Sequence, residues 1–546
     1  MALVCEQCRK VFGLNNVDVM VGSIQDPSTV PEKVGDLCVD SNDIHVTARS
    51  DESNEELYVK PEGDSDCLEH ELNPKRLRLS SSPFHLTEHM STNPTSRHHC
   101  IACLGTLDED FVLEIATTIP ITIEQEGYTG LRDFCLAIHM PLSLMIRRMG
   151  MEKYVQKQNG NQNSAYITVE GYVKEELRTK LREKLEKSLS LTYKVDSLFQ
   201  IIVKLEHSQS LEECQQLVNM YPDCFKKTTK RGRSKNRKTV EEDITIVPVR
   251  RALECATVED LSGHGYLLPA VELRCSHKIE LLHKPLYIGG RYNKYSRSLP
   301  QTPWVVDGIK KAESSVQELI CDQLSQLTRF SDVTFSASGR EDVDVRMLGT
   351  GRPFAVELTN PRNVCLWQED IDKVEELINK STPLIAVRGL TQVSKEETSL
   401  IKEGEVEKKK QYCALVWSEG EITAGDLACL EGIKDLKIAQ KTPIRVLHRR
   451  SLATRERTVY SMQSEVVDSH RFKLYLCCQA GTYVKEFVHS DFGRSQPSLG
   501  GLLSGREVGI LSLDVTDVQL EWPPTGMEEE AKTKSMRLMN SDMVCT

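Results

Sequence analysis

Residues 338–346 gather the side chains of this chain that are best suited to nucleophilic or acid–base chemistry. Three acids and two arginines lie within these nine positions, shortly after the β-prone run 333–335. If the stretch is extended, alternate side chains share a face, so that Asp342, Asp344 and Arg346 point the same way. Such a face is either the wall of an active site or the polar outer surface of an ordinary hairpin. Alternation alone does not choose between Asp342 and Asp344 as the reactive carboxylate.

Two Cys-x-x-Cys pairs have the spacing of metal ligands. Cys5 and Cys8 form the first pair, and Cys100 and Cys103 form the second. Two pairs supply the four thiolates of a tetrahedral zinc site, which leaves no open position for a catalytic water. The long segment between them is tolerated because loop-closure entropy grows only slowly with length. The sequence therefore predicts structural zinc, with two unrelated cysteine pairs as the alternative.

Tyrosines alternate with cations between positions 287 and 297. This composition suits a surface that stacks bases and pairs with phosphates. A polar loop whose tyrosines pack locally is the alternative. The residues predicted to contact RNA here are Arg291, Tyr292, Lys294, Tyr295 and Arg297.

The composition indicates an intracellular protein of several domains. A length of 546 residues suggests roughly three or four domains. The chain has no apolar run long enough to cross a membrane, and its first residues lack the features of a signal peptide. The net charge of −11 argues against nucleic acid as a partner, but much of the acid is concentrated in residues 34–71. We expect a protein of the cytoplasm and nucleus that does not bind membranes.

Changes in composition divide the chain into two structured units and three polar segments. The predicted units are an α/β domain at 1–20 and 97–265 and a strand-rich domain at 266–522. The predicted polar segments are a disordered acidic insert at 21–96, a flexible basic loop at 226–240 and a disordered tail at 523–546.

Apolar spacing gives a coarse secondary structure. Helices are predicted at 131–139, 173–190, 310–330 and 371–379. Strands are predicted at 197–205, 408–417, 445–450 and 472–477. A turn that leads into a helix is predicted at 480–489.

Several long motifs resemble the archaeal and eukaryotic tRNA pseudouridine synthase family called Pus-ten. The resemblance covers about residues 100–520. The motifs that carry it are Ser338 to Arg346, Gly351-Arg352-Pro353-Phe354, Gly481 to Gly493, Gly290 to Arg297 and Gln440-Lys441-Thr442-Pro443. It implies an α+β multidomain protein with a zinc-containing, THUMP-like α/β accessory domain. The catalytic domain would be a mixed, mainly antiparallel sheet with flanking helices.

The resemblance also implies roles for individual residues. Asp342 matches the family's catalytic aspartate, and Asp344 becomes a supporting residue. Tyr412 matches the tyrosine that stacks on the flipped base, and Lys485 matches the basic partner of the aspartate. Arg340 and Arg346 are expected to hold neighbouring phosphates.

The implied reaction isomerises T-loop uridines at tRNA positions fifty-four and fifty-five without a catalytic cofactor. The expected partners are tRNA and other structured RNAs, and the protein is expected to be a monomer.

Two other functions remain open on the sequence. One is a non-catalytic RNA-binding scaffold with a vestigial active site. The other is a metal-dependent nuclease in which Asp342 or Asp344, with Glu357, binds a divalent ion.

Overall fold

The computed structural model describes residues 4–12, 99–158, 169–226, 244–263, 271, 273–402, 409–448 and 450–524. The predicted acidic insert lies outside the described residues, as do all but the first residue of the predicted basic loop and nearly all of the predicted tail. No helix within the described ranges is long and apolar enough to span a membrane.

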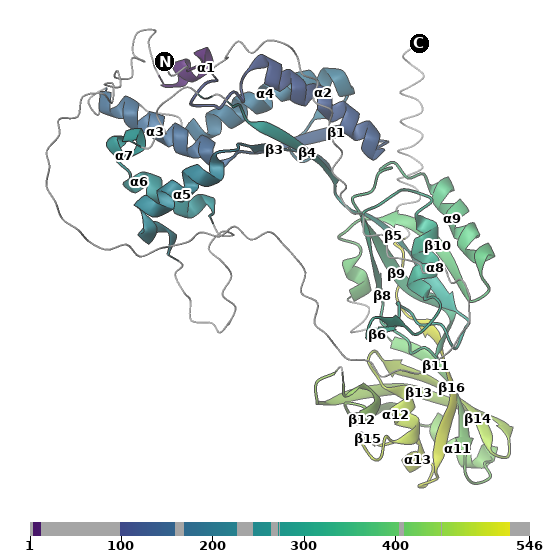
Figure 1. Cartoon of the computed structure of the whole chain (residues 1–546). Helices are drawn as coiled ribbons and strands as arrows, with labels where there is room; N and C mark the ends of the chain where they lie inside the picture. Colours follow the sequence, from purple (N-terminus) through teal and green to yellow (C-terminus); the bar gives the residue numbers. More distant parts are fainter. Residues whose placement is uncertain are drawn as a thin grey trace, which may run out of the picture.

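The N-terminal part, made of the described residues between 4 and 283, has a small sheet with helices over one face and a group of helices beside one end (Figure 1). The sheet has the order β2-β1-β3-β4, with parallel pairing on both sides of β1 and antiparallel pairing of β3 with β4. Its strands are β1 (Asp133–His139), β2 (Thr192–Tyr193), β3 (Phe199–Glu206) and β4 (Ser276–His283). Its helices are α1 (Glu6–Phe12), α2 (Glu109–Glu126), α3 (Leu142–Gln158), α4 (Val169–Leu189), α5 (Ser210–Met220), the 3-10 helix η1 (Pro222–Phe225), α6 (Ile246–Cys255) and α7 (Val258–Gly263).

The predicted helix at 131–139 is wrong, because this segment forms the central strand β1. Phe134, Leu136 and Ile138 alternate along the strand and are all buried. A short apolar run fits both helical and strand spacing, so its neighbours in space decide between them. Here β2 and β3 flank the run and satisfy its backbone hydrogen bonds.

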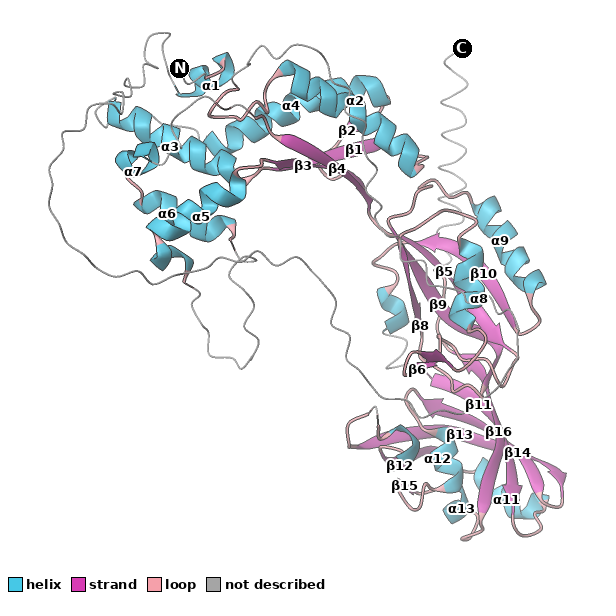
Figure 2. Cartoon of the chain, in the orientation of Figure 1, coloured by secondary structure: helices cyan, strands magenta, loops and turns pink. Residues whose placement is uncertain are grey.

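The C-terminal part, residues 286–524, is built on one sheet of ten strands (Figure 2). Nine strands follow the order β10-β5-β9-β16-β11-β14-β13-β12-β15, and β8 pairs with β9. Every pairing in this sheet is antiparallel except that of β9 with β16, which confirms the mixed, mainly antiparallel sheet. The strands of this part are β5 (Leu286–Lys294), β6 (Val305–Val306), β7 (Ile309–Lys310), β8 (Asp332–Ala337), β9 (Arg346–Thr359), β10 (Ile385–Val393), β11 (Lys409–Ser418), β12 (Lys434–Lys441), β13 (Thr454–Asp468), β14 (Arg471–Gln479), β15 (Ser495–Gln496) and β16 (Val508–Val518).

Helices flank this sheet, as expected. They are α8 (Val316–Leu324), α9 (Gln368–Ser381), α11 (Ala424–Glu431), the 3-10 helix η3 (Ile444–Val446), α12 (Val484–His489) and α13 (Leu499–Leu502). Of the predicted elements, 173–190, 197–205, 371–379, 408–417, 472–477 and 480–489 correspond to α4, β3, α9, β11, β14 and the turn into α12. The predicted helix at 310–330 is shorter, and the predicted strand at 445–450 is wrong. Pro443 (φ −59°) leads into the 3-10 turn η3 instead.

Candidate active site

Residues 338–345 form the loop between β8 and β9 and are not the extended strand that alternation suggested. The amide of Val345 donates to the carbonyl of Asp342 at 3.1 Å, which closes a turn inside the loop. Gly339 adopts φ +87°, a left-handed conformation that favours glycine. The loop therefore presents Asp342 at a bend of the chain, where its orientation depends on what holds the loop.

Lys294 on β5 holds the loop from beneath. Its side chain is completely buried, and Nζ donates to the carbonyls of Leu299, Asp342 and Val343 at 2.9, 3.0 and 2.9 Å. Burial lowers the pKa of Lys294 to about 8, although the negative charge of Glu341 acts to raise it. A buried amine with three carbonyl acceptors is well suited to fixing the backbone beside Asp342.

A buried ion pair holds the start of the same loop. Arg352 on β9 donates from Nε to Glu341 at 2.7 Å, and from a terminal nitrogen to the Ser338 carbonyl at 2.7 Å. The two charged side chains are 2% and 0% exposed. The Tyr292 hydroxyl donates to Glu341 at 2.9 Å and accepts from Gln301 at 2.7 Å. The polar atoms around Glu341 are thus paired, as a buried network requires.

These contacts correct part of the predicted RNA surface. Tyr292 and Lys294 are completely buried, so the prediction that they contact RNA is wrong. Arg291 is also used internally, because it donates to the carbonyls of Thr350, Val518 and Leu520.

The other predicted RNA contacts are more accessible. Arg297 and Arg346 both pair with Asp514 at 2.6 Å, which ties the loop's end to β16. Tyr295 is 46% exposed, and Arg340 is exposed. Contact with RNA stays a prediction for these four residues.

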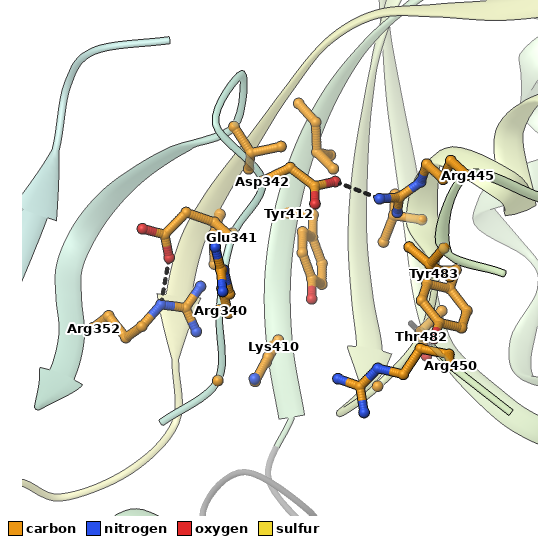
Figure 3. Close-up of a pocket in the computed structure, with 17 residues that line it drawn as sticks. Arg340, Glu341, Asp342, Arg352, Lys410, Tyr412, Arg445, Arg450, Thr482 and Tyr483 are labelled. Atoms are coloured by element: carbon orange, nitrogen blue, oxygen red, sulfur yellow. Dashed lines mark hydrogen bonds and ion pairs between the residues drawn. The ribbon is translucent and has the colours of Figure 1, made fainter. Parts of the chain in front are cut away.

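Asp342 lines a cavity of about 440 Å³ (Figure 3). The walls come from the loop 339–345, from β9, β11 and β16, from the turn 481–484 and from Arg445, Val446 and Arg450. The side chain of Asp342 is 33% exposed and lies 2.8 Å from an Arg445 guanidinium nitrogen and 3.5 Å from Lys485 Nζ. The cavity therefore brings one accessible carboxylate together with two cations.

Arg445 is a site residue that the sequence interpretation missed. Its Nε donates to Glu486 at 2.6 Å while a terminal nitrogen faces Asp342, so the guanidinium bridges two carboxylates. Burial opposes the charge of Arg445, but Glu486 and Asp342 outweigh it and raise the pKa of the guanidinium. The sequence signal is the basic run 445–450, for which apolar spacing predicts a strand.

Lys485, in the first turn of α12, lies between Asp342 and Asp344. Its Nζ donates to the two Asp344 carboxylate oxygens at 2.8 and 2.7 Å. Burial alone would raise the pKa of Asp344, but the hydrogen bond and charge of Lys485 lower it. Asp342 and Asp344 thus share one lysine, and only Asp342 also faces Arg445 and the cavity.

Tyr412 on β11 supplies the aromatic wall of the cavity (Figure 3). Burial raises the pKa of its phenol well above the ordinary value, so the hydroxyl stays protonated at neutral pH. The opposite wall is fixed by Gln440, which donates to the Tyr483 carbonyl and accepts from the Tyr483 amide, both at 2.9 Å. The structure therefore brings all three predicted catalytic residues, Asp342, Tyr412 and Lys485, to one site.

The four predicted metal ligands also meet in space. The sulfur atoms of Cys5, Cys8, Cys100 and Cys103 all lie within 4.8 Å of one another, and all but Cys5 are buried. Four soft sulfur donors at this spacing fit a metal such as zinc. We call this group the four-cysteine cluster.

Comparison with known proteins places the chain in a family. The model of the eukaryotic Pus10 N-terminal domain matches residues 100–271, and that of the Pus10 C-terminal domain matches residues 287–519. A curated relative from Xenopus laevis, named tRNA pseudouridine synthase Pus10, is 42% identical over 429 residues, which are 78% of this chain and 81% of the relative. The chain belongs to the Pus10 family. The human relative of the same name is 40% identical over 428 residues, covering 78% of this chain and 79% of its own length.

Membership makes this Pus10 protein a pseudouridine synthase, an enzyme of the isomerase class. Among solved structures, one titled a pseudouridylate synthase aligns over 47% of this chain and 77% of that chain, at 15% identity and a TM-score of 0.17. That similarity is too low to support an argument, so the assignment depends on the sequence relatives.

Proposed function

We propose that this Pus10 protein isomerises uridine to pseudouridine in tRNA, with Asp342 as the nucleophile. The observation that carries the proposal is the Asp342 carboxylate, held between Arg445 and Lys485 in a cavity that Tyr412 also lines. The reaction breaks the C–N glycosidic bond, rotates the base and rejoins it through carbon. A positioned carboxylate can attack either the sugar or the base, and no oxidant is required.

The cavity can hold one extruded nucleotide. Its volume of about 440 Å³ lies in the range of small-molecule sites. A uridine inside a folded loop must leave its stack to be reached, and an aromatic wall lowers that cost. Tyr412 has this role in our proposal, with its protonated hydroxyl as a hydrogen-bond donor. Lys485 and Arg445 keep the carboxylate pointed at the base.

We further propose that the substrates are the T-loop uridines at positions fifty-four and fifty-five. Support comes from the curated relatives, which are named tRNA pseudouridine synthases, and from the family motifs around Asp342. Pseudouridine mapping of tRNA treated with the protein would identify the position.

The decisive experiment compares Asp342→Asn with its neighbour Asp344→Asn as a matched control. Both changes remove one negative charge beside Lys485, but only the first removes the carboxylate that faces the cavity. We expect tritium release from labelled tRNA to be lost in Asp342→Asn and largely kept in Asp344→Asn. The opposite order would show that Asp344 is the nucleophile.

The wild-type assay and the positions of the acidic side chains bear on the other two functions. A non-catalytic scaffold would bind tRNA without isomerising it even in the wild type. A nuclease would require a cluster of acidic ligands. In the part of the chain that the structure describes, the only group of three or more possible metal ligands is the four-cysteine cluster, so Asp342, Asp344 and Glu357 do not form a three-ligand site. RNA cleavage that a chelator abolishes would support a site made of Asp342 or Asp344 with Glu357.

For the N-terminal part we propose a THUMP-like RNA-binding domain stabilised by zinc in the four-cysteine cluster. Four thiolates would close the coordination sphere, so the metal would stabilise the fold and take no part in the reaction. Metal analysis of the purified protein, with Cys100→Ser as the comparison, tests this. One equivalent of zinc that is lost in the variant is the expected result.

A further inference from the structure

The two parts of the chain meet at a junction built from residues 126–130, 281–285 and 360–363. β4 ends at His283 and β5 begins at Leu286, so a single short connection joins the two sheets. Figure 1 shows β4 leaving the N-terminal part toward β5. A connection of two residues by itself would act as a hinge.

Two backbone hydrogen bonds also join the two parts and restrain motion at this connection. The amide of Thr129 donates to the Arg362 carbonyl at 2.9 Å, and the amide of Val364 donates to the Thr129 carbonyl at 3.2 Å. The chain after α2 therefore pairs as a short parallel bridge with the chain after β9. Gly130 makes this approach possible, because a Cβ there would lie 2.7 Å from the Cys365 Cβ.

Side chains reinforce the bridge around Tyr128, which is 6% exposed. Arg362 donates to the Tyr128 hydroxyl at 2.8 Å and to Glu126 at 2.7 Å, and its guanidinium lies 4.5 Å from the centre of the Tyr128 ring. Tyr128 in turn donates to the Asn360 side-chain oxygen at 2.7 Å. That oxygen also accepts the His283 amide at 2.8 Å.

Asn360 connects all three segments of the junction. It adopts φ +50°, a left-handed conformation that is rare for residues other than glycine, asparagine and aspartate. One arginine, one tyrosine and one asparagine thus fix the end of β4, the end of α2 and the end of β9 together. None of the described residues that line the Asp342 cavity belongs to this network, so its members do not form the wall that would contact a bound base.

We propose that Arg362, with Tyr128 and Asn360, is a positioning clamp that sets the distance between the N-terminal part and the Asp342 cavity. A folded RNA that touches both parts is then held with its target uridine at the cavity, and the clamp selects substrates that reach across the junction. This inference rests on the proposed tRNA substrate and on RNA contacts by the N-terminal part. It assigns Arg362 a role in substrate choice that a purely structural residue would not have.

The test compares a whole tRNA with a short T-arm hairpin, using the full chain. Arg362→Ala and Tyr128→Phe weaken the clamp, and Arg471→Ala is the matched control. Arg471 is half-exposed and pairs only locally with Asp468. We expect Arg362→Ala to lower kcat/KM for tRNA roughly tenfold while changing that for the hairpin by less than about twofold. Tyr128→Phe should have a smaller effect in the same direction.

Two further measurements make the result independent of catalysis. Small-angle scattering should show a larger maximum dimension for Arg362→Ala than for the wild type and Arg471→Ala. Binding of catalytically inactive Asp342→Asn to tRNA should weaken when Arg362→Ala is added, and binding to the hairpin should not. Equal loss on both RNAs, or an unchanged dimension with unchanged tRNA binding, would overturn the clamp. A wild type that isomerises neither RNA would instead overturn the proposed function, while scattering and binding would still decide on the clamp.

Discussion

Replacing Arg445 tests how the active site positions Asp342, the proposed nucleophile. The guanidinium lies 2.8 Å from Asp342 and 2.6 Å from Glu486, so it fixes the carboxylate against a buried neighbour. Lys485 is 3.5 Å from Asp342 but bonds Asp344 at 2.7 Å, and it cannot replace the missing contact. In Arg445→Ala the Asp342 carboxylate loses its closest hydrogen-bond donor.

The expected decrease in kcat for Arg445→Ala follows from that single contact. A hydrogen bond between charged groups contributes about 1.5–3 kcal/mol. If this energy holds Asp342 in its attacking rotamer, its loss lowers kcat by roughly 10- to 150-fold. Loss of the positive charge should by itself raise kcat, because a cation that stabilises the carboxylate before the attack slows the attack. The sign of the change therefore shows whether positioning or charge dominates, and we expect a decrease.

Single-turnover tritium release from labelled tRNA measures the step directly. Arg445→Lys keeps the charge but cannot bridge both carboxylates, so it should also be slow. Glu486 is 2% exposed, and its unpaired charge would destabilise Arg445→Ala. The double variant Arg445→Ala/Glu486→Gln should therefore recover folding without recovering kcat. An Arg445→Ala enzyme with normal kcat and only a raised KM would refute the reasoning and make Arg445 an RNA contact.

Three further predictions follow from the residues beneath the loop and from the four-cysteine cluster. Arg352→Met should destabilise the protein by about 3–5 kcal/mol in urea unfolding, because it leaves the buried Glu341 carboxylate without its cation. Adding Glu341→Gln should restore part of that stability, and a loss below about 1 kcal/mol would contradict the buried pair. The pKa of Lys294 is lowered to about 8 in the folded state, so the unfolded state binds more protons between that pH and the ordinary lysine pKa. Wild-type stability should therefore rise relative to Lys294→Met from pH 8 to 10 in urea titrations, and a constant difference would show that the shift is absent. Removing metal with a chelator should lower the melting temperature of the N-terminal part, as measured by circular dichroism. The isomerisation rate on a T-arm hairpin should stay unchanged, and a loss of that rate would place the metal in the reaction.

The elements that the sequence predicted well are those with long, regular patterns. The helix α4 and the strands β3 and β11 lie where their apolar periodicity placed them. The prediction of a helix at 131–139 failed because nine residues fit both the helical and the strand period. Only pairing with β2 and β3 makes this segment a strand. The prediction of an extended strand at 338–346 failed for a related reason. Alternating charged and apolar residues fit a strand whether or not a neighbouring strand pairs with them.

Within the site, local motifs predicted which side chains could carry the chemistry. The Asp342 loop, the Tyr412 strand and the turn before Lys485 each have a motif that can be recognised without the rest of the chain, and the structure brings the three together. Tertiary structure alone decided which cations serve which purpose. Lys294 is buried beneath the loop, while Arg445, from a segment where the sequence predicts a strand, pairs with Asp342, the proposed nucleophile. Cations look alike in sequence, and their burial and partners depend on segments far away in the chain.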